Sequence, residues 1–312
     1  MTFPAFGELP QIPQAPALRH SWDVFGRDDN LGTVNRITGD VLVAAAALIR
    51  EGERVGVCLP VDEPKPTLFG RPGLEHVSTR SEYGWNDTFH HFDPQATTQW
   101  DGLRHIRGRS SGHYGGWDGR SGDDPGRIGV SYWADQGIVS RGLLADVHGA
   151  LDYDPMEGYA ITVADLEATL TTAGVSPREG DVLCVRTGWT DRYHQMSDAE
   201  RAEYAAQFVG GRMGDSAGLK GDAQMAEFLW DSGFAAVAVD NPGVEVSPGD
   251  PWFGTLHRQL IPGLGFAIGE LFDFGPLAEA CRRHRRWEFF FASVPLKITG
   301  GAGSTGNAVA IF

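Results

Sequence analysis

The sequence predicts a single layered α/β domain, because helices and buried strands alternate along the chain. Three helix–strand units carry the pattern, with predicted bounds 162–174 and 181–187, 222–231 and 234–239, and 276–286 and 287–294. Such alternation is typical of architectures in which helices cover at least one face of a sheet. The 312-residue chain shows no short internal repeat and no linker, so we expect one domain over residues 21–312.

The predicted helices have recognisable ends. Thr162 and Asp165 form a capping-box pattern, and Gly174 is suited to terminate that helix. Near the N-terminus, Asp40 is expected to cap a helix over residues 41–50, followed by a strand over 54–61. Residues 64–93 are rich in Pro, Gly and polar side chains, which predicts an irregular segment. A flap over a site is one interpretation of such a segment.

The first twenty residues carry four prolines, Pro4, Pro10, Pro13 and Pro16. Proline fixes φ and withholds a backbone donor, so we expect residues 1–20 to form an extended arm. Such an arm has no core of its own, and it is predicted to lie across another protomer of a homo-oligomer, a dimer or tetramer.

Composition excludes several classes of partner. The hydrophobic fraction of 41% and the charged fraction of 21% are those of a globular protein, and a net charge of −15 repels nucleic acid and anionic membrane surfaces. No apolar run approaches the length of a membrane span, and three separated cysteines are typical of buried reduced thiols. The basic run 282–286 is expected at a helix end. We therefore expect a cytoplasmic protein that acts on a small molecule.

The stretch ATTQWDGLRH, residues 96–105, contains the most informative polar residues. Gln99 and Asp101 are two apart, so on a strand they face one side and Trp100 faces the other. His105 has an ordinary pKa of about 6.5, which suits general acid/base catalysis. The alternative is a polar strand edge with a hydrogen-bonded core histidine.

This stretch resembles the H-x-G-T-H-x-D-x-P-x-H signature of the cyclase family, which includes bacterial kynurenine formamidase and isatin hydrolase. Gln95 and Gln99 stand where the family has two metal-ligand histidines, while Asp101 and His105 match its aspartate and last histidine. Further segments are similar to family motifs in the same order, as in a longer-chain subgroup: 22–26, 28–35, 137–147, 185–189, 240–245, 256–258, 269–271, 295–296 and 300–307.

The resemblance implies a β/β/α domain of the kynurenine formamidase-like, swivelling type. It also implies that His257 and Glu270 complete a metal position with Asp101, to which Gln99 adds a neutral oxygen ligand. Replacing imidazoles by amides favours harder ions, so Mn or Mg is expected rather than Zn. The alternatives are a hydrogen bond from His257 to a backbone carbonyl and a surface ion pair between Glu270 and Arg258.

Several aromatic and basic residues are candidates for other roles. Trp85, Trp100, His113 and Tyr114 are predicted to bind substrate, and Trp117 and Trp252 are further candidates for the pocket wall. Arg186 is expected to form a buried ion pair, with Asp240 or Asp146 as its partner.

Two catalytic functions and one binding function follow. The leading hypothesis is a metal-dependent hydrolase of a C–N bond in an amide, formamide or cyclic amide on an aromatic or apolar scaffold. The second is a metal-independent cyclase, dehydratase or isomerase of natural-product metabolism, in which His105 and Asp101 transfer protons. The third is a non-catalytic ligand-binding relative.

Overall fold

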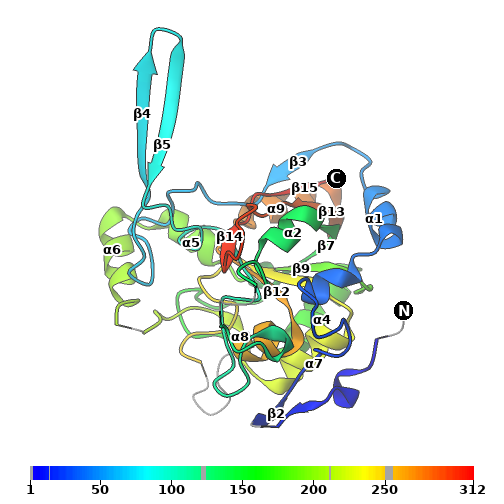
Figure 1. The fold of residues 1–312 in the computed structure, drawn as a ribbon. Helices are drawn as coiled ribbons and strands as arrows, with labels where there is room; N and C mark the ends of the chain where they lie inside the picture. The colour runs from blue at the N-terminus through cyan, green and yellow to red at the C-terminus, as the bar shows by residue number, and fades with distance from the viewer. Residues whose placement is uncertain (1–2, 14, 121–123, 211, 250–255) are drawn as a thin grey trace.

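The computed structural model describes residues 3–13, 15–120, 124–210, 212–249 and 256–312, and its centre is a long mixed sheet (Figure 1). The strand order is β14-β6-β12-β11-β9-β7-β13-β15-β3. β7, β9, β11 and β12 are parallel neighbours, and the outer strands pair antiparallel. The strand bounds are β3 Arg54–Gly56, β6 Gln99–Asp101, β7 Ile138–Asp146, β9 Val182–Arg186, β11 Ala236–Val239, β12 Ala267–Glu270, β13 Glu288–Ser293, β14 Gly303–Thr305 and β15 Ala308–Ile311.

Helices pack on both faces of this sheet. Alternate residues of the central strands enter two different buried clusters: Leu144 and Cys184 lie in one, and Leu143 and Val185 in the other. The helix bounds are α1 Gly39–Ala46, α2 Ser131–Gln136, α3 Val147–Ala150, α4 Val163–Thr172, α5 Trp189–Gln195, α6 Asp198–Ala206, α7 Ala223–Asp231, α8 Leu256–Gln259 and α9 Gly275–His284. Short helical turns cover Phe6–Glu8, Gly32–Arg36, Tyr114–Gly116 and Leu260–Leu264, and a small sheet pairs β8, Ala160–Ile161, with β10, Gly218–Leu219. In the described ranges, no helix is both long and apolar enough to cross a membrane.

The three predicted helix–strand units are confirmed as α4–β9, α7–β11 and α9–β13. The capping box at Thr162 and Asp165 is present. The prediction for α1 was wrong in detail, because Thr38 rather than Asp40 accepts the capping hydrogen bond, from Val41, and the helix ends at Ala46.

Arg186 and the basic run 282–286 both form ion pairs. Arg186 bonds Asp146 at 2.6 Å, as predicted, and Asp191 at 2.9 Å. The basic run lies at the end of α9, where Arg282 contacts Asp146 at 2.8 Å. All three cysteines are free thiols; Cys184 and Cys281 are buried, as expected, whereas Cys58 is half-buried.

The N-terminal segment is not the extended arm that its prolines predicted. It forms a turn and a small hairpin of β1, Gln11–Ile12, and β2, Ala15–Arg19. Phe6, Leu9 and Ile12 are buried, because they pack in hydrophobic clusters with distant parts of their own chain. The N-terminal segment thus packs into the core of its own chain, so its burial gives no reason to place it on another protomer. A homo-oligomer remains a prediction.

Part of the segment predicted to be irregular is a regular hairpin. β4, Glu75–Ser81, pairs along its whole length with β5, Gly84–His90, and in Figure 1 the pair projects from the body of the molecule. Every residue of both strands is exposed. Because neither face is buried, the strands lack the apolar alternation by which a strand is recognised in a sequence.

Candidate functional site

The pairing of β6 with β12 builds the base of a polar site. Their antiparallel register places Gln99 opposite Glu270 and Asp101 opposite Ile268. Gln99 and Asp101 share one face of β6, so both side chains lie beside Glu270. All three side chains are buried. The Gln99 amide donates a hydrogen bond to Glu270 Oε2 at 2.7 Å.

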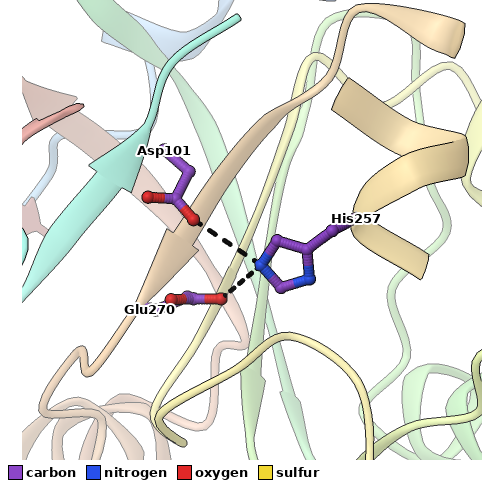
Figure 2. A group of neighbouring side chains, drawn as sticks. All are labelled: Asp101, His257 and Glu270. Carbon is purple, nitrogen blue, oxygen red and sulfur yellow. Dashed lines mark ion pairs between the residues drawn. The ribbon is translucent and has the colours of Figure 1, made fainter. Parts of the chain in front are cut away.

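His257 reaches this face from α8, on a different segment of the chain (Figure 2). Its Nε2 lies 2.9 Å from Glu270 Oε1 and 3.6 Å from Asp101 Oδ2. One ligand atom from each of Asp101, His257 and Glu270 lies within 4.8 Å of the other two. The two pairs of residues that the sequence comparison proposed therefore do converge, although about 150 positions separate them.

His105 contacts the same Asp101 oxygen as His257, and the centroids of the two rings are 6.5 Å apart. Its Nε2 is 3.5 Å from Asp101 Oδ2, and its Nδ1 is 2.9 Å from the amide nitrogen of Gln95. The same Gln95 amide donates to Asp101 Oδ1 at 2.5 Å. With 22% of its side chain exposed, His105 is accessible to a small molecule, whereas Asp101 is not.

Glu245 belongs to the family-like segment 240–245, and the structure gives it a definite contact. Its Oε2 lies 2.6 Å from Nδ1 of His257, and its side chain is buried. Its place six residues after the buried strand β11 was the available signal, since side chains that follow strand ends often form sites in α/β folds.

Burial and mutual charge set the ionisation of these groups. Burial disfavours a charged imidazole at His257, but the carboxylates of Glu245, Asp101 and Glu270 outweigh it and hold its pKa well above the ordinary value. Burial, reinforced by the charge of Asp101, raises the pKa of Glu270. Burial also opposes ionisation of Asp101, yet His105, His257 and Gln95 together lower the pKa of that carboxyl.

The site has the charge and the free acceptors that a cation requires. Asp101, Glu245 and Glu270 are three buried carboxyl groups around one imidazole, and buried charge of one sign is costly unless it is paired. Asp101 Oδ2 and Gln99 Oε1 are buried, and neither has a hydrogen-bond partner in the described part of the chain. Two unsatisfied oxygens beside an imidazole and a second carboxylate fit a hard divalent ion.

A cavity of about 490 Å³ opens over these groups. Its volume is in the range of small-molecule sites. Gln99, His105, Glu245, His257 and Glu270 line its polar end. Apolar side chains and two arginines line the rest: Phe69, Ile106, Met213, Pro242, Arg71 and Arg258.

Four residues predicted to bind substrate do not line this cavity. Trp100 is fully buried on the opposite face of β6, where its Nε1 donates to Ser293 at 2.8 Å. Tyr114 is also fully buried and bonds Asp29. His113 packs against Trp117, outside the cavity, and Trp85 is 66% exposed on the projecting hairpin. Proximity in sequence was the only basis for these assignments; Trp252 lies outside the described residues.

Comparison with known proteins assigns the class. Residues 35–246 match the family model described as putative cyclase, so the chain belongs to the cyclase family. A crystal structure of a novel cyclase is 28% identical, covers 94% of this chain and 99% of its own, and superposes with a TM-score of 0.81. No curated protein matches the sequence.

Two more distant structures share the fold. Isatin hydrolase A from Ralstonia solanacearum is 19% identical over 88% of this chain and 97% of its own, with a TM-score of 0.60. The predicted metal-dependent hydrolase from Bacillus stearothermophilus is 17% identical over 84% and 98%, with a TM-score of 0.51. These similarities confirm the predicted α/β fold, which the chain shares with cyclase-family and isatin hydrolase structures.

Proposed function

We propose that this member of the cyclase family is a hydrolase that cleaves a C–N bond in an amide, formamide or cyclic amide on an aromatic or apolar scaffold. The proposal depends on one observation above all: Asp101, His257 and Glu270 present ligand atoms within 4.8 Å of one another at the polar end of a cavity. Isatin hydrolases share the fold, and their name describes such a reaction.

We further propose that these three residues hold a divalent metal ion, with Gln99 as a neutral oxygen ligand. A bound ion would polarise a carbonyl group and acidify water, which is the chemistry that hydrolysis of a stable amide requires. The donor set contains one nitrogen and otherwise oxygens, so Mn or Mg suits it better than Zn.

His105 is the proposed general acid/base, with Asp101 beside it. Cleavage of a C–N bond needs a proton at the departing nitrogen, because an amide anion is a poor leaving group. The Gln95 amide, donating to Nδ1 of His105, leaves the proton of the neutral imidazole on Nε2. Nε2 lies 3.5 Å from Asp101 Oδ2, so this carboxylate and the Gln95 amide together orient the ring.

A second function has a specific observation in its favour. The amides of Gln95 and Gln99 donate hydrogen bonds to Asp101 and Glu270, and a protonated His257 supplies positive charge among the carboxylates. These contacts would stabilise the site without an ion. The alternative is therefore a metal-independent cyclase or dehydratase that uses His105 and Asp101 for proton transfer.

Elemental analysis of the purified protein, combined with activity assays on amides, formamides, cyclic amides and lactones, tests the proposal. We expect Mn or Mg near one equivalent and amide hydrolysis that a chelator abolishes and Mn restores. Activity that is unaffected by complete metal removal would favour the metal-independent alternative. Absence of turnover across the panel with the metal bound would contradict the hydrolase proposal.

A further inference from the structure

Two arginines border the same cavity whose polar end is acidic. Arg258 follows His257 on α8, and Arg71 precedes the projecting hairpin; both side chains line the cavity. The acidic groups at the polar end, Glu245 and Glu270, already bond His257. The wall of the cavity thus carries guanidinium groups as well as carboxylates.

Neither guanidinium has its hydrogen-bonding capacity filled by the described residues. Arg258 forms no ion pair with any described carboxylate, including Glu245 and Glu270. Arg71 uses one nitrogen, Nη1, for both oxygens of Asp93, at 3.2 Å each, while its Nε is buried and has no acceptor in the described ranges. A buried donor without an acceptor costs about 1–3 kcal/mol. Arg258, and Arg71 through Nη2, which forms no hydrogen bond to the described residues, therefore have donors for an incoming acceptor.

The chemistry of a guanidinium group selects the ligand. Its planar donors match a carboxylate with two parallel hydrogen bonds, and charge assistance makes these bonds about twice as strong as neutral ones. A phosphate monoester offers similar oxygens but carries about two charges. The three buried carboxyl groups of the site repel a dianion more strongly than a monoanion, which favours a carboxylate.

Apolar side chains complete the wall of the cavity that also carries these charged groups. Phe69, Ile106, Met213 and Pro242 line the cavity, and Phe69 is held edge-on against Phe208, with ring centroids 4.9 Å apart. A volume of about 490 Å³ accommodates a substituted aromatic ring together with two polar groups.

We propose that the substrate is an amide that carries a carboxylate group, and that Arg258, assisted by Arg71, binds this carboxylate while the amide lies against Asp101, His257 and Glu270. This inference rests on the proposed hydrolase function for the position of the amide. It goes further by naming the substrate class and the residues that select it.

Binding of a matched pair of probes, 2-formamidobenzoate and formanilide, tests the inference independently of turnover. The two compounds differ only in the carboxylate. Binding is measured by calorimetry on full-length His105→Ala protein supplied with Mn, since this background slows hydrolysis. We expect the carboxylate probe to bind at least about tenfold more tightly, as one good charge-assisted pair of hydrogen bonds provides.

Variants separate the arginine from other sources of affinity. Arg258→Ala should reduce the affinity ratio of the two probes to near one, and Arg258→Lys should retain part of it. Arg107→Ala is the matched control, because Arg107 follows the cavity residue Ile106 but is exposed and does not line the cavity. It should leave the ratio unchanged.

Three outcomes would overturn the inference: equal affinity for the two probes, no detectable binding of either, or an affinity ratio that Arg258→Ala leaves intact because the carboxylate binds the metal. Hydrolysis of formanilide by the wild type reports separately on the proposed function. A hydrolase without preference for the carboxylate probe would contradict only the substrate class, and preferential binding without hydrolysis would contradict only the proposed reaction.

Discussion

Glu245 Oε2 lies 2.6 Å from Nδ1 of His257, on the side of the imidazole opposite the atom that contacts Glu270 and Asp101. This contact fixes the orientation of the ring and directs Nε2 toward the other two carboxylates. A carboxylate behind a metal-ligand histidine also increases the basicity of the ligand. Glu245 therefore acts as a positioning residue for the proposed metal site.

Removing the charge of Glu245 should weaken metal binding. We expect Glu245→Gln to lower Mn affinity by about 10–100-fold, the usual effect of losing such an outer carboxylate. Calorimetric titration with MnCl2 measures this directly. Glu227→Gln, at an exposed position of α7, is the control for the loss of one negative charge. Equal losses in the two variants would mean that net charge, rather than the contact with His257, determines affinity.

Loss of the His105 imidazole should affect turnover. We expect His105→Ala to lower kcat by about a hundredfold or more, the usual contribution of a positioned general acid/base. His113→Ala is the matched control, since His113 lies outside the cavity, and it should retain kcat. Full activity of purified His105→Ala, or an equal loss in both variants, would contradict the catalytic assignment.

The sequence predicted the layers of the fold because each unit carried local signals. Thr162 and Asp165 mark the start of α4 by their side-chain chemistry alone. The strand β9 that follows is apolar from Val182 to Val185, because both faces of the sheet are covered there. The hairpin β4–β5 lacked such a signal, since an exposed ladder needs no apolar face. The prolines of the N-terminal segment predicted an extended arm, and this prediction was wrong. Leu9 and Ile12 are buried by contacts with distant residues, which local sequence does not reveal.

In the site, too, local sequence pattern predicted some of the contacts and left others unpredicted. The alternation of a strand sufficed to place Gln99 and Asp101 together, and it also placed Trp100 on the far face, where it is part of the core. The contact of β6 with β12 joins residues about 170 positions apart, and only the family resemblance indicated it. Arg71 and Glu245 reach the cavity from loops. The path of a loop depends on tertiary packing and leaves no periodic pattern in the sequence.

Asp240 should make stability depend on pH. Burial raises the pKa of Asp240 to about 7, despite hydrogen bonds from Thr187 and Gly188. The unfolded value is about 3.9, so between these values the folded state holds a proton that the unfolded state lacks. This contribution is complete below pH 4 and is lost as pH rises through 7, by up to about 1.4 kcal/mol per unit.

The Asp240→Asn variant isolates that contribution, because an amide cannot ionise. We expect its unfolding free energy, measured by urea denaturation from pH 4 to 8, to fall less with rising pH than that of the wild type. The amide nitrogen also faces the Gly188 N–H, and this mismatch should lower stability equally at all pH values. Parallel pH profiles for the two proteins would show that Asp240 ionises normally.

Gln99 distinguishes the two proposed functions most sharply. Its side chain already reaches Glu270 Oε2, and its own oxygen is buried without a donor in the described residues. If the site binds metal, Gln99→His restores the family's imidazole. It should then increase Zn affinity by at least tenfold, the contribution of even an outer ligand, because borderline-soft ions gain most from nitrogen.

Gln136→His, exposed at the end of α2, controls for Zn binding to any added histidine. In a metal-independent cyclase the substitution recruits little Zn, since Gln95 leaves the ligand set incomplete. Calorimetric titration of the three proteins decides: equal, negligible Zn binding in wild type and Gln99→His would defeat the metal-dependent hydrolase and leave proton transfer by His105 and Asp101 as the better account.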